Sequence, residues 1–388
     1  MAKNNMKPRI RFKGFTDAWE QRKLGEISEK TVEKNRERRY SETFTNSAEF
    51  GIVSQMEYFD HAISKIESIG GYYVVHPDDF VYNPRISVSA PVGPINRNKL
   101  QKIGIMSPLY TVFRAHDIHP QYLEYYFKSD VWHAYMRFNG DSGARSDRFS
   151  IKTALFFDMP IPCPSVGEQE KIGKILARVD NLITLHQRKY EKFVNIKKAL
   201  LEKMFPQGDE KVPRIRFKGF TDAWEQRKFG DVFSYERPDK YIVESDKYSD
   251  FYSTPVLTAN KGFVLGYTNE KRTYNTPCVI FDDFTLDSKY VDFPFMVKSS
   301  ALKILTTKQG YYLPFAYELL HAANIEVLGH ARHYISVVQP TMVLVPNYSE
   351  QLRVGKFIEA IDNLITLHQR QVEKLKNIKS ALLEKMFV

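Results

Sequence analysis

The chain repeats two framework segments, and this repeat constrains its fold more than any other feature. Residues 8–23, PRIRFKGFTDAWEQRK, recur without a change at 213–228. Residues 180–188, DNLITLHQR, recur at 362–370, and ALLEKMF at 199–205 recurs at 381–387. The blocks enclosed by these segments differ in length and share little sequence. A repeated frame around unlike blocks predicts one scaffold that presents two different binding domains.

The closing segment of each half predicts a long helix. Between Glu168 and Phe205 there is no proline, and apolar residues recur at alternating steps of four and three. The same pattern occupies 350–387, and such a period is typical of a coiled coil. Helices of this kind are seldom stable alone, so we expect the two to pair. Only a short polar linker, 206–212, follows the first helix, so the second helix should run back antiparallel to it.

The apolar positions of the two helices define their expected interface. His186 and His368 fall at the midpoints of the helices, so a symmetric antiparallel register should bring them face to face. A flanking apolar stripe implies further burial, either under the chain's own globular domains or against helices of another protein. The expected helix–helix or partner interface comprises Leu176, Val179, Ile183, His186, Tyr190, Phe193, Ile358, Ile361, Ile365, His368, Val372 and Leu375.

Together these features predict an α+β chain with an internal pseudo-twofold repeat. Two mixed α/β domains would be separated by a long antiparallel two-helix coiled coil. Short apolar and aromatic runs predict strands at 71–75, 110–113, 279–281 and 301–305, and helices are expected at 120–128 and 313–323. The predicted boundaries are 1–166 for the first domain (with the repeated segment 8–23), 167–206 for the first helix, 207–348 for the second domain (with 213–228) and 349–388 for the second helix.

Composition narrows the kind of partner. The chain carries 56 Lys and Arg against 46 Asp and Glu, a net charge of +10. A basic surplus favours a polyanionic partner, most often nucleic acid. The only two cysteines, Cys163 and Cys278, make no disulfide framework and suit a reducing compartment. No run of about 18 apolar residues occurs, so we expect a cytoplasmic protein without a membrane span.

Two glycine-containing loops are the strongest candidates for nucleic-acid contacts. Residues 139–149, NGDSGARSDRF, and 328–334, LGHARHY, each carry a Gly and then Ala-Arg. Glycine lets a backbone approach a ligand closely, and arginine presents a planar fork to phosphate or guanine. Ordinary surface turns with solvated arginines would give the same pattern. The predicted DNA-binding residues, which include polar stretches elsewhere, are Arg145, Arg148, Ser142, Asn83, Arg85, Arg97, Lys99, Arg332, His333, Tyr334, Thr285 and Lys289.

Motifs for chemistry are missing from the sequence. It contains no GxxxxGK[ST] phosphate-binding loop, so ATP-driven translocation is not encoded here. The segment 83–85, NPR, lacks the second proline and the aromatic residue of the amino-methyltransferase motif, and no glycine-rich cofactor loop precedes it. The pairs His116/His119 and His330/His333 have no credible third metal ligand. We therefore predict no catalytic, cofactor-binding or metal site in this chain.

Two frames, each with a tryptophan-containing segment and a Glu-Gln…Asp-Asn-Leu-Ile-Thr-Leu-His-Gln-Arg helix, enclose two unlike domains. In these features the chain resembles the specificity subunit of type I restriction–modification enzymes over essentially its whole length. The resemblance implies two target recognition domains, one per half-site of a bipartite DNA site, and two methyltransferase subunits docked on the helices. It also implies two restriction motor subunits and one copy of this chain in the complete enzyme. Those partners would supply the S-adenosylmethionine, ATP and Mg chemistry, and this chain would be a non-catalytic recognition subunit.

Two other functions fit the same residues. A free-standing DNA-binding regulator would bind DNA tightly without depending on a methyltransferase. A coiled-coil scaffold that uses its two domains for protein ligands would show no salt-sensitive DNA binding.

Overall fold

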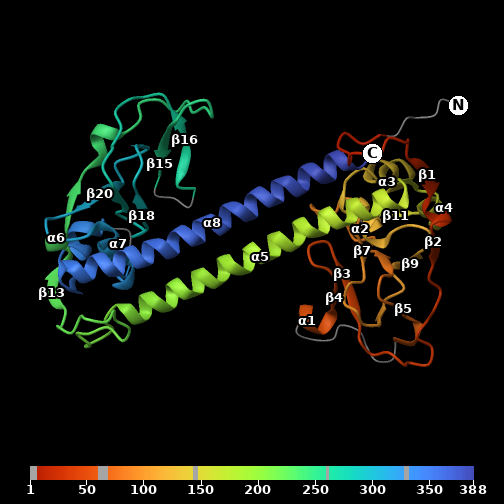
Figure 1. Ribbon diagram of the computed structural model, residues 1–388, viewed down its shortest axis with the longest axis horizontal. Helices are drawn as coiled ribbons and strands as arrows, with labels where there is room; N and C mark the ends of the chain where they lie inside the picture. Colours follow the sequence, from red (N-terminus) through yellow and green to blue (C-terminus); the bar gives the residue numbers. More distant parts are fainter. Residues whose placement is uncertain (1–6, 60–68, 143–146, 259–261, 327–331) are drawn as a thin grey trace. The chain divides into compact units, whose positions relative to one another are not determined.

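The computed structural model describes residues 7–59, 69–142, 147–258, 262–326 and 332–388, which fall into two compact units (Figure 1). The first unit comprises Met1–Leu185 and Gln371–Val388, and the second comprises His186–Arg370. Two helices of 39 residues each, α5 (Val166–Met204) and α8 (Tyr348–Met386), contribute to both units. The helices expected at 167–206 and 349–388 are present, but the compact units divide within them rather than where they begin.

In the first unit, parts of α5 and α8 pack against each other. Lys379 Nζ lies 2.6 Å from Asp180 Oδ1, and Met386 joins the buried core that also contains Leu176. Moving forward along α5 from Leu176 to Asp180 corresponds to moving backward along α8 from Met386 to Lys379. The two helical segments of this unit therefore run antiparallel, as the linker length predicts.

The second unit contains the other parts of the same helices. Lys197 Nζ lies 2.7 Å from Asp362 Oδ2, and Met204 shares a core with Ile358. This pairing is antiparallel by the same reasoning. The interface residues nearest the globular parts, such as Leu176 and Ile358, are fully buried. The interface residues in the middle of the sequence pattern, such as Ile183 and Ile365, are only half-buried.

A four-stranded antiparallel sheet forms the centre of the first unit. The helix α2 (Pro120–Lys128) begins at a proline, which suits a first turn because its fixed φ is helical and no N–H is needed there. Its aromatic residues enter the core beside this sheet. The sheet order is β2 (Ser28–Lys30), β9 (Thr111–Ala115), β6 (Phe80–Tyr82) and β7 (Ile95–Arg97). The other strands are β1 (Glu20–Lys23), β3 (Phe44–Ser47), β4 (Gly51–Ser54), β5 (Tyr73–Val75), β8 (Gly104–Met106), β10 (Gly140–Asp141), β11 (Ser150–Ile151) and β12 (Pro160–Cys163). The other helices are α1 (Gln55–Phe59), α3 (His133–Asn139), α4 (Thr153–Phe157) and two 3-10 helices, η1 (Leu24–Glu26) and η2 (Ile69–Gly71).

The second unit is built on a sheet of the same kind. Its order is β14 (Phe233–Glu236), β20 (Leu302–Thr307), β17 (Cys278–Asp282) and β18 (Ser288–Val291), and every pair is antiparallel. All five residues of β17 are buried, as expected for an apolar strand between two neighbours. The other elements are β13 (Glu225–Lys228), β15 (Thr254–Leu257), β16 (Val264–Thr268), β19 (Met296–Val297), β21 (Met342–Val345), α6 (Phe229–Val232), α7 (Leu313–Ala322), a 3-10 helix, η3 (Pro238–Tyr241), and a π-helical turn, η4 (Tyr334–Val338).

The two sheets share one topology although their sequences have little in common. When the four strands of each sheet are numbered by their order along the chain, both sheets have the spatial order first, fourth, second, third. A flanking hairpin is also shared: β3–β4 connects to β8 through a parallel bridge, Thr43 to Ile105, and β15–β16 connects to β19 through parallel pairing. The strands and helices expected from apolar runs are confirmed by β5, β9, β17, β20, α2 and α7.

The repeated segments close each unit through buried ionic contacts. Arg11 donates two hydrogen bonds to Glu168 at the start of α5, at 2.7 and 2.8 Å, and Trp19 Nε1 donates to the same carboxylate. In the second unit Arg216 donates to both oxygens of Glu350 at 2.7 Å. Both carboxylates are buried. The repeated segments therefore orient the first turn of each long helix. Within the described ranges, no helix combines the length and the apolar character needed to cross a membrane.

Candidate nucleic-acid interface

Two stretches of the first unit that were predicted separately to bind DNA lie together. Arg85 and Arg148 are directly opposite each other in an antiparallel bridge. Two backbone hydrogen bonds flank the bridge, from Phe149 N to the Pro84 carbonyl at 2.8 Å and from Ile86 N to the Asp147 carbonyl at 3.1 Å. Like charges directly opposite in a strand pair are destabilising, so this position gains from an anionic ligand.

Arg148 also borders a small cavity of about 300 Å³. Its Nε is buried and, among the described residues, makes no hydrogen bond; it lies 3.9 Å from Asp147 Oδ2. Arg85 is exposed beside it, and Ser142 is exposed in the same loop. Arg145 lies outside the described residues, so its predicted role stays a prediction.

Asn83 has an internal role in this turn. It is buried, its Nδ2 donates to the Asn46 carbonyl at 2.8 Å, and its Oδ1 accepts from Arg85 N at 3.0 Å. Gly93 closes the turn with φ +83°, and a Cβ there would meet the Asn83 carbonyl at 2.1 Å. The side chain of Asn83 thus shapes the backbone that presents Arg85, and contact with DNA is not needed to explain it.

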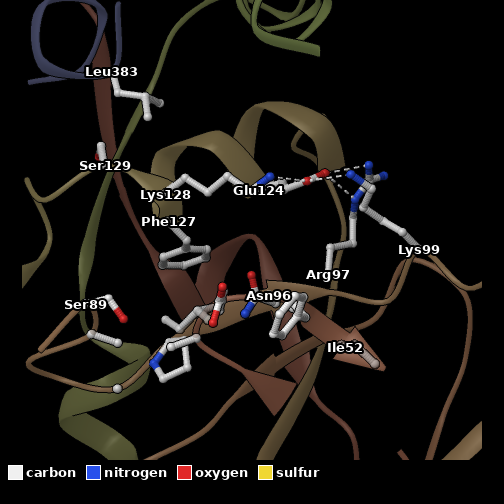
Figure 2. Close-up of a pocket in the computed structure, with 18 of the residues that line it drawn as sticks. Ile52, Ser89, Asn96, Arg97, Lys99, Glu124, Phe127, Lys128, Ser129 and Leu383 are labelled. Atoms are coloured by element: carbon white, nitrogen blue, oxygen red, sulfur yellow. Dashed lines mark hydrogen bonds and ion pairs between the residues drawn. The ribbon is translucent and has the colours of Figure 1, made fainter. Parts of the chain in front are cut away.

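Arg97 and Lys99 converge on one buried carboxylate, Glu124, as Figure 2 shows. Lys128 joins them at 3.0 Å, and Arg97 also pairs with Asp78. Burial alone would raise the pKa of Glu124, but Lys128, Lys99 and Arg97 outweigh it and lower that pKa to about 2. The cluster forms one wall of a cavity of about 600 Å³ between the hairpin β3–β4, α2 and α8. Sequence reasoning missed Glu124, because nothing local shows that three cations would reach it.

In the second unit the arginine loop also meets the segment that follows a central strand. Arg332 is exposed, and its guanidinium lies 5.9 Å from the centroid of the Phe284 ring. Thr285 is exposed in the same turn. Lys289 is half-buried, with its ammonium 4.4 Å from the centroid of the Phe263 ring. Arg332, which lies in the described part of the loop expected to match 139–149, is therefore beside the turn that follows β17.

His333 and Tyr334 are buried, unlike the exposed arginine that precedes them. His333 N donates to the Asp283 carbonyl at 2.8 Å. The Tyr334 ring packs edge-on against Phe281 with centroids 5.5 Å apart. These side chains hold the loop to the core, so as placed they present no surface to a ligand.

The central histidines of the helices lie in contact within the second unit, as predicted from their positions. His186 Nδ1 and His368 Nδ1 are 2.9 Å apart. Exposed apolar side chains also occur along both helices; they include Leu185, Val194, Phe357, Leu364, Leu367 and Ile378. No group of three or more His, Cys, Asp or Glu side chains with metal-binding geometry occurs in the part of the chain that the structure describes.

Residues 16–193 match the family model of the type I restriction modification DNA specificity domain. These residues, somewhat less than half of the chain, therefore carry a domain of the type I restriction–modification specificity family. The specificity subunit of the type I restriction enzymes EcoR124I and EcoR124II from Escherichia coli is 40% identical to it over 125 residues, 30% of this chain and 31% of that subunit. The type I restriction enzyme MjaIX specificity subunit from Methanocaldococcus jannaschii is 23% identical over 321 residues, 75% of this chain and 70% of that subunit. The aligned part of the chain thus spans about a third of the first relative's length.

A solved structure supports the fold over the whole chain. The S subunit of a type I restriction-modification system from M. genitalium aligns with a TM-score of 0.70 and covers 99% of both chains. Sequence identity in that alignment is 13%, so the likeness concerns the fold. The alignment therefore shows that this chain and that S subunit share a fold.

Proposed function

We propose that this chain is the DNA-specificity subunit of a type I restriction–modification complex and that each unit reads one half-site of a bipartite DNA site. The observation that carries this proposal is the shared placement of an arginine loop. In both units it lies against the turn that follows the equivalent central strand, at Arg85 and Arg148 in one and at Phe284 and Arg332 in the other. Arginine in such a place suits phosphate or the guanine edge.

Divergence of the loops within one topology supports two different half-sites. The frame is repeated almost letter for letter, whereas the turns carry different side chains. The net charge of +10 favours association with a polyanion and makes it sensitive to salt. The chain itself contributes no catalytic residue to the proposed complex, and it would act in the cytoplasm.

The helices provide the proposed docking surface for methyltransferase subunits. The middle of the predicted coiled coil is only half-buried, and apolar side chains such as Leu185 and Leu367 are exposed beside it. Exposed apolar stripes of this kind mark protein interaction sites. One copy of the chain would carry two methyltransferase subunits and, in the complete enzyme, two restriction motor subunits. S-adenosylmethionine, ATP and Mg would act in those partners.

The test is selection from a random-sequence duplex DNA library by the full-length chain, followed by sequencing. We expect two short blocks of preferred bases with a constant gap between them. Exchange of residues 24–166 for the block of another family member should change one base block only. Change of both blocks, or of neither, would contradict one half-site per unit. Tight selection that is independent of any methyltransferase would favour a free-standing regulator, and absence of salt-sensitive binding would favour a protein scaffold.

A further inference from the structure

Asp283 joins three parts of the second unit at the end of β17. Its side chain is buried, with Oδ2 3.1 Å from Nζ of Lys303, a residue of β20 that is also buried. Its Oδ1 accepts a hydrogen bond from Tyr334 N at 2.8 Å. Its backbone carbonyl accepts from His333 N at 2.8 Å. One residue thus ties the sheet to the two positions that follow Arg332.

The other side of Arg332 is fixed to the same turn. Its guanidinium lies over Phe284, and Phe284 N donates to Asp282 Oδ1 at 2.7 Å. Asp282 Oδ1 also accepts from Thr285 N at 3.0 Å. The backbone that follows Arg332 is therefore held by hydrogen bonds to Asp283, and the turn under its guanidinium is held by hydrogen bonds to Asp282.

The presence of a buried ion pair does not by itself indicate greater stability, because apolar residues of similar volume at the same positions often give a protein that is equally stable. This pair has a second effect that apolar residues lack. Lys303 occupies one carboxylate oxygen and so directs the other at the Tyr334 N–H. A buried N–H without an acceptor is costly, so loss of that oxygen should move the backbone of 332–334.

We propose that Asp283, whose carboxylate pairs with Lys303, is a positioning residue that fixes the direction in which Arg332 meets DNA. This inference rests on the proposed function of the second unit. The first unit has the neutral Asn83 directly after β6, where the second has Asp283 after β17. Loss of the Asp283 oxygen that accepts from Tyr334 N should therefore alter the half-site read by the second unit and leave the other unchanged.

The test compares two double variants of the full-length chain in the random-duplex selection. Both K303M/D283N and K303M/D283L remove the ion pair without leaving a buried charge unpaired. The asparagine keeps an oxygen acceptor for Tyr334 N, whereas leucine removes it. We expect K303M/D283N to keep the base preference of the second half-site. We expect K303M/D283L to weaken the preference at one base position by roughly tenfold, the scale of a single side chain–base interaction.

Arg332→Ala supplies the reference and separates the two proposals. We expect R332A to relax the base preference at one position of the second half-site. If the triple variant that combines R332A with K303M/D283L shows the same preference as R332A alone, Asp283 acts through Arg332. Equal preference in both double variants would overturn the positioning role while leaving the proposed function intact. Unchanged preference in R332A itself would show that the loop does not read DNA. If K303M/D283L fails to fold, K303M/D283S replaces it, because the serine hydroxyl is too short to reach Tyr334 N and the same loss is expected.

Discussion

His186 and His368 meet within the second unit, with their Nδ1 atoms 2.9 Å apart and their ring centroids 5.1 Å apart. Phe193 stacks on the His368 ring, with an interplanar angle of 9°. At this separation one Nδ1 carries the hydrogen and the other accepts it, so the accepting ring must be neutral. A polar pair at a helix seam favours one register over its alternatives.

The histidine pair should make the stability of the helices depend on pH. Burial lowers the pKa of His368, and the nearby His186 and Lys189 lower it further. The folded state therefore disfavours the proton, and stability is complete above the unfolded pKa of about 6.5. It should fall as the pH drops below that value towards the folded pKa.

Thermal unfolding of the full chain at pH 8 and at pH 5.5 tests this dependence. His368→Asn should lose less stability between these pH values than the wild-type chain. His116→Asn, at an exposed histidine beside Asp117, is the matched control and should behave like the wild type. An equal loss in all three chains would show that the pair does not sense pH.

Glu124 and Glu318 occupy equivalent positions, each four residues after the proline in the first turn of its helix, yet should respond oppositely to neutralisation. Burial raises the pKa of Glu318 to about 7, although the nearby Lys197 opposes this rise. Lys197 Nζ donates a hydrogen bond to Asp362 as well as to Glu318. The Oε2 atom of Glu318 is buried and has no hydrogen-bond partner among the described residues. The raised pKa means that stability falls as the pH rises from about 4.3 to 7. For Glu124, whose pKa is lowered, stability is present above about pH 4.3 and is lost as the pH falls towards 2.

Isosteric variants measure this difference directly. At pH 8, Glu318→Gln should raise the urea midpoint and Glu124→Gln should lower it. Each unit of displaced pKa corresponds to about 1.4 kcal/mol of differential stabilisation. At pH 5 the gain from Glu318→Gln should shrink. Shifts of the same sign at pH 8 would contradict the different surroundings of the two carboxyls.

The ion pair of Arg11 with Glu168 should contribute far more than an exposed pair on the same helix. Glu168→Gln leaves a mostly buried guanidinium without its counter-charge, and loss of one partner of a buried pair costs about 3 kcal/mol or more. Glu170→Gln removes the exposed pair with Lys174, which lies one helical turn further along α5, and should change stability little. Denaturant unfolding of the two variants gives both values. Similar midpoints would mean that the repeated segment does not anchor α5.

Arg85 and Arg148 should contribute to DNA affinity in the first unit. If either arginine hydrogen-bonds a base edge, its replacement in Arg85→Ala or Arg148→Ala should cost about 1–3 kcal/mol at one position only. If it pairs with a phosphate instead, the replacement should weaken binding to all sequences and reduce the salt slope by about one. Binding measured over a range of salt concentrations distinguishes the two. Unchanged affinity in both variants would identify the bridge as an ordinary turn.

The proposed docking surface can be tested at one position of α8. Leu367→Glu places a charge in the exposed apolar stripe, so co-purification of the methyltransferase subunit of the same system should fall at least tenfold. Thr366→Glu adds the same charge at the neighbouring exposed residue and should have little effect. Equal retention in both variants would move the docking surface away from this stripe.

The long helices could be derived from the sequence, because heptad periodicity and the absence of proline are local properties. Their antiparallel direction followed from the short linker 206–212, and the meeting of His186 with His368 followed from symmetry. The anchoring of Glu168 by Arg11 was missed. The signal was available, because both residues recur in the second half as Arg216 and Glu350.

Strand order and the composition of the candidate site required the tertiary structure. An apolar run predicts a strand, but pairing of β2 with β9 joins segments that are distant in sequence, and the runs themselves do not name their partners. The bridge between Arg85 and Arg148 arises from such a long-range pairing.

The polar residues that the sequence predicted to bind DNA fall into an accessible group and a buried group for a similar reason. The sequence by itself determined the repeated frame, the two long helices and the basic loops. Only the tertiary structure decided that Arg85, Arg148 and Arg332 are accessible to a ligand while Asn83, His333 and Tyr334 are turned inward. A polar side chain can be buried when backbone groups from elsewhere satisfy its hydrogen bonds, and these groups are brought to it by folding.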